Sequence, residues 1–406
     1  MSKVDPKLIP EVNIGMVGHV DHGKSTITEM LTGKWPAQHS EELKRGITIR
    51  LGYADATFYR CPKCGTYSTS KKCPKCFSDT EIQRTVSFVD APGHESLMAT
   101  VLTGASLLDG ALLVIAADEK CPMPQTKEHL KALEVVGIDK IVIVQNKIDL
   151  VTPERAKENY EEIKEFVKGT IAENAPIIPI SAQQRVNAEY LIEAIETTIP
   201  TPERDPSKHP IMLIARSFDI NKPGYPPKKL VGGILGGSLI QGRLKVCDEI
   251  EIRPGIKVGN DWKSLTTEVV SLQKAGITLE DAGPGGLLGV MTKLDPALTK
   301  SDGLAGNVVG HPDKLPPVWK EIELEVHLLE RIVGTKEEQE VKPIQKNEVL
   351  MINVWTSRSV GIVEEVKGDY TRLKLKLPVC AEVGSRVVLS RQIAGRWRLF
   401  GWGILK

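Results

Sequence analysis

Apolar runs alternate with helical patterns through the first half of the chain. The runs at 12–17, 86–89, 111–115, 141–144 and 177–180 are typical of strands. Helical periodicity follows each of them, up to residue 33 and then over 94–106, 124–136, 153–173 and 189–197. The strand runs are apolar on both faces, so we expect a mostly parallel sheet with helices on both faces. Ligands of such sheets bind at the carboxyl ends of the strands.

The pattern changes at the proline-rich polar stretch 200–206, which we interpret as a linker. Short alternating strands and glycine turns follow, and Pro316-Pro317 marks a second boundary. The glycine-rich segment 232–237 is not followed by a helix, so barrel-corner glycines are a better interpretation than a phosphate loop. We predict an α/β domain over 1–205, a β-barrel domain over 206–316 and a second β-barrel domain over 317–406.

Composition limits what the chain can be. Its 406 residues are 41% hydrophobic and 26% charged, as in ordinary globular proteins of two to four domains. The formal charge of +1 leaves any nucleic-acid contact to local patches. No apolar run is long enough to cross a bilayer, and the N-terminus lacks a signal-peptide pattern, so we expect a cytoplasmic protein without a membrane partner.

A phosphate-binding motif lies between the first strand and the first helix. Residues 18–25, GHVDHGKS, fit G-x-x-x-x-G-K-[ST] in the strand–loop–helix context that such a loop requires. Glycine lets the backbone turn several N–H groups towards a polyphosphate, and the helix N-terminus adds a positive field. Lys24 would reach the terminal phosphates and Ser25 would bind Mg²⁺. The expected nucleotide contacts are Gly18, Val20, Asp21, His22, Gly23, Lys24, Ser25 and Thr26.

Three further motifs follow predicted strands in the order that a guanine-nucleotide site needs. Asp90-Ala91-Pro92-Gly93 fits D-x-x-G, in which Asp90 holds Mg²⁺ through a water and the Gly93 N–H meets the γ-phosphate. The sequence at 146–149 fits N-K-x-D, whose aspartate accepts from the guanine N1–H and amine, a pattern that adenine cannot satisfy. The sequence therefore predicts GTP. The expected base contacts are Asn146, Lys147, Asp149, Ser181 and Ala182.

The remaining candidates concern hydrolysis. Thr48, in the run 45–49, lies where a GTPase has its first switch, although it could be an ordinary strand threonine. His94 follows Gly93, where a residue that orients the attacking water belongs, although it could be an exposed helix-start histidine. The catalytic set is thus His94, Thr48 and Lys24. The set for Mg²⁺ and a weaker candidate monovalent cation is Ser25, Thr48, Asp90, Asp21 and Gly46.

Four of the seven cysteines form a C-x₂-C-x₈-C-x₂-C cluster. Two such turns close a tetrahedral sulfur site, so Cys61, Cys64, Cys73 and Cys76 predict structural Zn²⁺ in an insert over about 58–80, with free thiols as the alternative. Gly65 allows the left-handed backbone that such a turn favours, whereas Phe77 in the second turn predicts a less regular knuckle. Its position before D-x-x-G suggests a partner contact rather than chemistry.

Taken together, GHVDHGKS, RGITI, DAPGH, NKID and SA resemble the translational GTPases of the elongation-factor-Tu type, whose P-loop GTPase domain and two β-barrels match essentially the whole length. The run 39–48, the cysteine insert after 51–54 and the run 390–398 are similar to the gamma subunit family of archaeal and eukaryotic initiation factor two, and the compact length favours the archaeal members. The resemblance implies a heterotrimer with alpha and beta subunits. It also implies carriage of initiator methionyl-tRNA to the small ribosomal subunit in the GTP state, with slow unassisted hydrolysis.

Three alternatives stay open at this point. A relative with another cargo would be an elongation factor for ordinary or selenocysteinyl aminoacyl-tRNA, and a non-catalytic relative would be a scaffold that only binds GTP. The C-terminal arginines and tryptophans are equally compatible with a nucleic-acid face and with a barrel strand that has tryptophans inside. That segment contains Arg391, Arg396, Trp397, Arg398 and Trp402.

Overall fold

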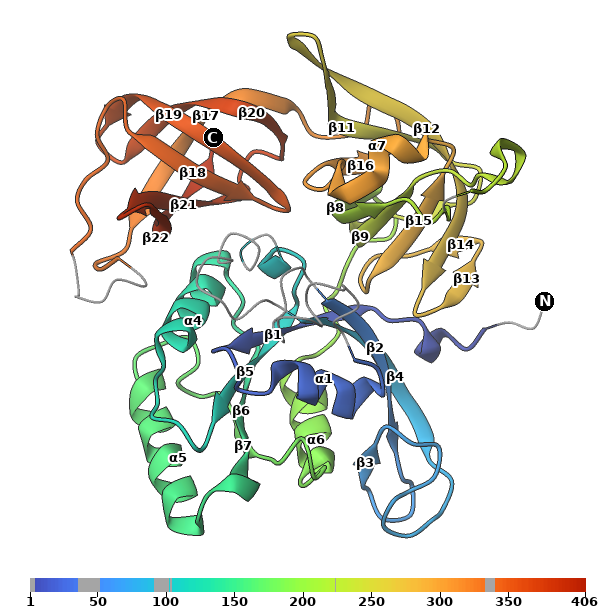
Figure 1. Ribbon diagram of the computed structural model, residues 1–406, viewed down its shortest axis with the longest axis vertical. Helices are drawn as coiled ribbons and strands as arrows, with labels where there is room; N and C mark the ends of the chain where they lie inside the picture. The colour runs from blue at the N-terminus through green and yellow to red at the C-terminus, as the bar shows by residue number, and fades with distance from the viewer. Residues whose placement is uncertain (1–3, 36–51, 91–101, 103, 223, 333–339) are drawn as a thin grey trace. The chain divides into compact units, whose positions relative to one another are not determined.

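The computed structural model describes residues 4–35, 52–90, 102, 104–222, 224–332 and 340–406 (Figure 1). These residues form two compact units, Met1–Pro202 and Glu203–Lys406. The first unit is an α/β layer structure and the second is built from two β-barrels. The fold class predicted from the sequence is therefore confirmed.

A seven-stranded sheet organises the first unit, in the order β3-β2-β4-β1-β5-β6-β7. The pairs β4–β1, β1–β5, β5–β6 and β6–β7 are parallel, and β2 pairs antiparallel with β4 and β3. Every residue of β1, β5 and β6 is buried, as expected of strands covered on both faces. The strands are β1 Val12–Gly18, β2 Gly52–Arg60, β3 Tyr67–Ser68, β4 Glu81–Asp90, β5 Gly110–Ala116, β6 Ile141–Asn146 and β7 Ile177–Pro179.

Helices cover both faces of this sheet, with α1 and α6 on one side and α4 and α5 on the other (Figure 1). Gly33 and Gly137 end α1 and α4 in the left-handed conformation, and Thr152 caps α5 by accepting the Arg155 N–H. The described helices of this unit are α1 Lys24–Thr32, α4 Pro124–Val136, α5 Pro153–Val167 and α6 Ala188–Thr198, with short 3₁₀ turns η1 Pro6–Leu8 and η3 Ile148–Leu150.

One predicted helix is shorter in the structure than its sequence pattern indicates. The helix expected over 153–173 ends at Val167, because Lys168 has ψ of 130° and Gly169 a φ of +70°, so the backbone leaves the helical region there. The helical pattern of charged residues continues past this point in the sequence, so the pattern alone did not predict the end of the helix at Val167. Most of the helix expected over 94–106 lies outside the described residues.

The second unit holds two closed sheets. In the first, β11-β16-β8-β9-β15-β12 close through the β11–β12 pairing, with β13 added at β12 and a small β10–β14 pair beside them. Gly237 lies in β9, where a Cβ would come within 1.8 Å of the Leu213 carbonyl oxygen, so the glycine-rich segment serves strand packing. The strands are β8 Ile211–Phe218, β9 Ile234–Gln241, β10 Leu244–Lys245, β11 Glu249–Val258, β12 Asp261–Lys274, β13 Ile277–Leu279, β14 Asp281–Ala282, β15 Leu288–Thr292 and β16 Val308–Gly310. Its short helices are η4 Pro227–Lys229, α7 Pro296–Thr299 and η5 Lys300–Asp302.

The other barrel closes in the order β17-β20-β19-β18-β21-β22. Leu324, Leu373 and Phe400 belong to its buried apolar core. The barrel strands occupy 318–405 and those of the preceding sheet 211–310, so we keep 206–316 and 317–406 as the proposed domain boundaries. The strands are β17 Val318–Leu328, β18 Val349–Val354, β19 Ser357–Lys367, β20 Tyr370–Cys380, β21 Arg386–Ile393 and β22 Arg396–Leu405.

The C-terminal arginines and tryptophans lie on β21 and β22 of this barrel. The Arg391 guanidinium is bonded to Glu348 and donates to the carbonyls of Lys342 and Pro343. Trp402 stacks on His327 with ring centroids 4.2 Å apart, beneath the Arg386 guanidinium. Arg391 is thus held by neighbouring segments of the barrel, whereas Trp402 is half-buried and lies outside the apolar core, so the placement of tryptophans inside the barrel is not confirmed for Trp402.

Candidate nucleotide-binding site

The loop after β1 has the backbone that close contact with a polyphosphate requires. Gly18 has a φ of +139° and Gly23 a φ of +91°, and Gly23 is the residue before the first turn of α1. A Cβ at Gly18 would lie 2.3 Å from the Val114 carbonyl oxygen, and one at Gly23 would lie 2.3 Å from Asn146 Nδ2. Both glycines are therefore demanded by space as well as by backbone conformation.

Lys24 and Ser25 are the first two residues of α1, directly after this loop. Lys24 Nζ donates to the carbonyl oxygens of Gly18, at 3.1 Å, and His19, at 2.5 Å. Burial lowers the pKa of Lys24 to about 8, because desolvation penalises its charged form. A polyphosphate beside Lys24 would favour the charged form of its amine, because the negative charge offsets the hydration that burial removes.

Ser25 and Asp90 meet although they are far apart in sequence. Ser25 Oγ donates to Asp90 Oδ2 at 2.8 Å, because the parallel pairing of β1 with β4 brings both strand ends to the same edge. One hydroxyl and one carboxylate are hard oxygen ligands of the kind that Mg²⁺ takes, so the residues present fit that ion. Bound Mg²⁺ would neutralise phosphate charge.

The base-recognition motif is held by Asn146 at the end of β6. Its Nδ2 donates to the His22 carbonyl at 2.9 Å, and its Oδ1 accepts the Ala182 N–H at 3.1 Å. One buried side chain thus joins the phosphate loop to the Ser181–Ala182 loop. Lys147 has a φ of +64° and pairs with Asp118 at 3.2 Å, while Asp149 lies exposed in η3.

The other predicted contacts fall in two groups. Val20 and Thr26 are half-buried in the loop and first turn, and Asp21 is exposed with a φ of +62°. The predictions for Gly46, Thr48, Gly93 and His94 lie outside the described residues. Their roles stay predictions.

Sequence reasoning missed His129, which holds the phosphate loop, and did not assign the protein contacts of the His22 imidazole. His129, buried on α4, accepts the Gly18 N–H through Nδ1 at 2.8 Å, and burial lowers its pKa to about 3. The imidazole of His22 lies 3.0 Å from the Val114 carbonyl oxygen and 3.4 Å from Glu119. A histidine on the buried side of an amphipathic helix was the only available signal for His129, and many core histidines share it.

Residues 61–80 form the cysteine module, at the opposite end of β4 from Asp90. The four sulfurs of Cys61, Cys64, Cys73 and Cys76 lie within 4.8 Å of one another. Three of the separations are 3.4, 3.5 and 3.7 Å. Tetrahedral Zn²⁺ with bonds of about 2.3 Å needs sulfurs about 3.8 Å apart, so the cluster fits zinc. The hydroxyl of Ser78 lowers the pKa of Cys76 to about 6, which favours the thiolate that a metal requires.

The two cysteine turns have the same backbone, contrary to the prediction for Phe77. Gly65 N donates to Cys61 O at 2.9 Å and Phe77 N donates to Cys73 O at 3.0 Å. The φ of Gly65 is +74° and that of Phe77 is +59°. The prediction of a less regular second knuckle was wrong, because the hydrogen bonds of the turn hold Phe77 in the left-handed region despite its side chain.

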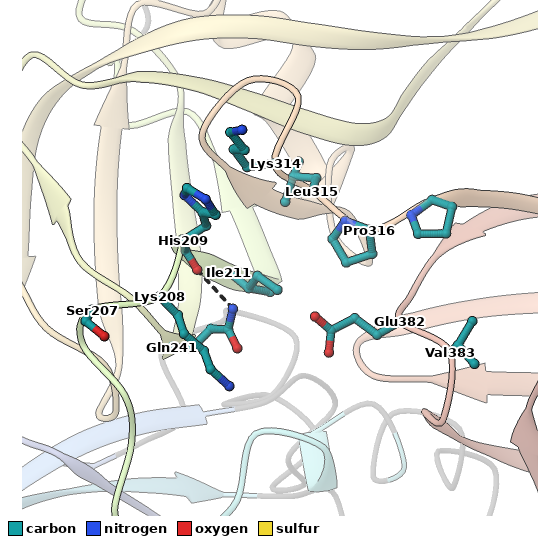
Figure 2. A pocket seen from close by; sticks show the side chains of 11 residues that line it. Ser207, Lys208, His209, Ile211, Gln241, Lys314, Leu315, Pro316, Glu382 and Val383 are labelled. Carbon is teal, nitrogen blue, oxygen red and sulfur yellow. Dashed lines mark hydrogen bonds between the residues drawn. The ribbon is translucent and has the colours of Figure 1, made fainter.

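The described residues also line a cavity of about 700 Å³ in the second unit. Lys208, His209 and Gln241 lie on one side of it, and Glu382 and Val383 on the other (Figure 2). Gln241 Nε2 donates to the His209 carbonyl at 3.0 Å. None of the described residues that were predicted to bind nucleotide or metal lines this cavity.

Comparisons with known proteins agree with this geometry. Residues 10–201 match the elongation factor Tu GTP binding domain family, and residues 320–405 match the family described as initiation factor eIF2 gamma, C terminal. Translation initiation factor 2 subunit gamma of Pyrococcus horikoshii is 63% identical over 400 residues, which cover 98% of this chain and 97% of that protein. The subunit of the same name from Methanocaldococcus jannaschii is 62% identical over the same shares of the two chains.

Among solved structures, the bacterial selenocysteine-specific elongation factor EF-Sec superposes with a TM-score of 0.75 at 22% identity, over 98% of this chain and 58% of that one. Elongation factor SelB of Methanococcus maripaludis, in complex with a GTP analogue, superposes with a TM-score of 0.73 at 23% identity, over 98% and 79% of the two chains. At these identities the likeness shows the fold, and this chain spans less than two thirds of the first structure's length.

Fold, loops and family matches define a GTP-hydrolysing enzyme of the translational GTPase class, which uses GTP, GDP and Mg²⁺. No helix in the described part of the chain has both the length and the apolar character to span a bilayer. Within this class, the chain belongs to the family of the translation initiation factor 2 gamma subunit, whose compared members are archaeal. It is a GTPase subunit of an initiation factor.

Proposed function

We propose that the loops at the carboxyl edge of the first sheet bind one GTP and that its hydrolysis to GDP and phosphate switches the subunit. The bonds of Asn146 to His22 and Ala182 support this proposal best, because they hold the phosphate and base loops at one site. Lys24 would contact the terminal phosphates, Ser25 and Asp90 would hold Mg²⁺, and Asp149 would accept from guanine. The Gly93 N–H would contact the γ-phosphate, so that loss of this phosphate would release the loop and change the shape of the subunit.

We further propose that the GTP form carries initiator methionyl-tRNA to the small ribosomal subunit, as part of a heterotrimer with alpha and beta subunits. The support is the identity of 63% to a protein named as the gamma subunit of translation initiation factor 2. The alternative of an elongation factor rests on structures only 22–23% identical, which share the fold. It is the less supported interpretation.

Filter binding tests this function. The chain, assembled with its alpha and beta subunits, should retain methionyl initiator tRNA in the presence of a GTP analogue. It should bind elongator methionyl-tRNA more weakly, and with GDP in place of the analogue it should bind the initiator tRNA more weakly. The matched variant is Asp149→Asn: an asparagine NH₂ can donate to the C2 carbonyl of xanthine, so tRNA binding should come to depend on XTP. Equal binding of elongator tRNA would contradict the cargo, and no change of nucleotide preference would contradict the base contact.

The proposed hydrolytic role of His94 needs its own test. His94→Ala should leave GTP affinity unchanged and slow single-turnover hydrolysis, since the residue would orient water rather than bind nucleotide. An unchanged hydrolysis rate, measured with and without ribosomal subunits, would dismiss the role.

A further inference from the structure

The tip of the cysteine module carries an aromatic ring that does not contribute to the core. Phe77 is 77% exposed, more than any other large hydrophobic residue of the described chain. It also has a φ of +59°, a region that a residue of this size rarely adopts. The left-handed backbone costs folding free energy and the exposed ring contributes none in return, and a backbone outlier of this kind at a surface points to function.

The first cysteine turn shows what the fold alone would choose. Gly65 occupies the place of Phe77 there, with the same hydrogen bond and a φ of +74°. Open space surrounds that position, since the nearest atom to an added Cβ is 4.0 Å away. Neither turn therefore demands a ring for packing, and the phenyl group of Phe77 faces solvent.

The module that carries the ring is rich in lysine. Residues 61–80 contain four lysines, Lys63, Lys71, Lys72 and Lys75, and a single acidic residue, Asp79, in a chain whose formal charge is only +1. All four lysines are exposed. Lys72 pairs with Asp79, and Lys75 lies 3.3 Å from Glu189 on α6. Lys63 and Lys71 have no ion-pair partner within the described ranges.

The module is also fixed to the rest of the first unit. Lys75 Nζ lies 5.6 Å from the centre of the Tyr190 ring as well as beside Glu189, so α6 anchors the second turn. The β2–β4 ladder holds its other end. A ring held on such a support can stack on a ligand without a large loss of conformational entropy.

We propose that this tip, defined as Lys63, Lys71, Lys72, Lys75 and Phe77, binds an unpaired RNA segment. Phe77 stacks on one base, and Lys63 and Lys71 contact the neighbouring phosphates. An exposed ring on a lysine-rich module suits a base with its phosphodiesters, whereas a protein hot spot is packed within a surrounding shell of contacts. Phe77 is the only large apolar side chain exposed on residues 61–80, so the module itself provides no such shell. Duplex RNA is excluded as the main ligand because its bases are stacked inside the helix.

Fluorescence anisotropy tests the proposal on the full chain with measured zinc content. The probes are single-stranded oligonucleotides of about twelve nucleotides and a duplex of the same length. Phe77→Leu and Phe77→Gly should weaken single-strand binding roughly tenfold, whereas Phe77→Trp should retain it, because stacking needs an aromatic face. The Gly variant relieves the backbone strain, so a loss of affinity with unchanged zinc content would not come from misfolding.

Charge reversal provides the second arm. The double variant Lys63→Glu with Lys71→Glu should weaken binding and reduce the slope of log affinity against log salt by about 1.4, or about 0.7 for each phosphate. Lys157→Glu, an exposed lysine on α5, is the matched control and should change neither.

Wild-type affinity in Phe77→Leu, an unchanged salt slope or absence of single-strand binding by the wild-type chain would each overturn the proposal. Variants that keep RNA affinity but lose a co-purifying subunit would also overturn it and would assign the tip to a protein.

Discussion

The two ends of β4 use left-handed backbone for different reasons. At the nucleotide end, Gly23 has a φ of +91°, and a Cβ would lie 2.3 Å from Asn146 Nδ2. At the cysteine end, Gly65 has a similar φ with no atom nearer than 4.0 Å to an added Cβ, and Phe77 adopts the same conformation. The nucleotide end is constrained by space, whereas the cysteine end is constrained by its turns and by the zinc that the four cysteines would hold.

This contrast predicts that the two ends can be damaged independently. β4 has ten residues and a rise of about 3.3 Å per residue, which places the cysteine module roughly 30 Å from Asp90. The two ends share a strand but none of the described hydrogen bonds of one end reaches the other.

The largest expected effect is loss of zinc. Cys73→Ser should abolish metal binding and melt residues 61–80 locally, because structural zinc supplies about 10–16 kcal/mol of folding free energy in small modules. GTP affinity should be unaffected. Elemental analysis, hydrogen exchange over 61–80 and titration with a fluorescent GTP analogue measure the three quantities. A parallel loss of GTP affinity would show that the ends are coupled.

Glycine replacement comes next and compares the ends directly. Gly23→Ala should weaken GTP binding roughly 100-fold, about 3 kcal/mol, because the new Cβ displaces Asn146 and strains the loop. Gly65→Ala is the matched control and should cost only about 1 kcal/mol of local stability, with GTP binding intact. Similar nucleotide affinities in the two variants would contradict the claim that steric crowding constrains Gly23 while only backbone conformation constrains Gly65.

The phosphate loop should also make stability depend on pH through His129. Burial lowers its pKa from 6.5 to about 3, so the unfolded state binds more protons between these values and stability rises with pH across that window. His129→Asn keeps an acceptor for the Gly18 N–H but cannot titrate. It should remove up to about 1.4 kcal/mol per pH unit of the dependence below pH 6.5. Urea unfolding of both proteins at several pH values measures this, and parallel curves would rule out His129.

The smallest effect concerns Phe77. Phe77→Gly should stabilise the cysteine module by about 0.5 kcal/mol, the relief of left-handed strain less the entropy that glycine adds to the unfolded chain. Competition with a zinc chelator measures this stabilisation, which should appear as tighter binding of zinc by the variant. Weaker retention would mean that the ring packs against the module after all.

The sequence by itself determined the layers and the chemistry. Apolar runs indicated buried parallel strands, because a strand covered on both faces needs apolar residues at every position, and β1, β5 and β6 are fully buried. The phosphate and cysteine motifs carried their own local geometry, since glycine conformation and ligand spacing act over a few residues. These signals correctly predicted that a glycine loop joins β1 to α1 and that the four cysteines lie together.

Only the tertiary structure decided which distant groups meet. The 2.8 Å contact of Ser25 with Asp90, the two bonds of Asn146 and the acceptance of the Gly18 N–H by His129 each join segments at least 36 residues apart. Sheet order and helix packing set these contacts, and no local pattern encodes them. The left-handed conformation of Phe77 escaped prediction for a related reason: side-chain preference is a weak local term, and the cooperative hydrogen bonds of the turn overrode it.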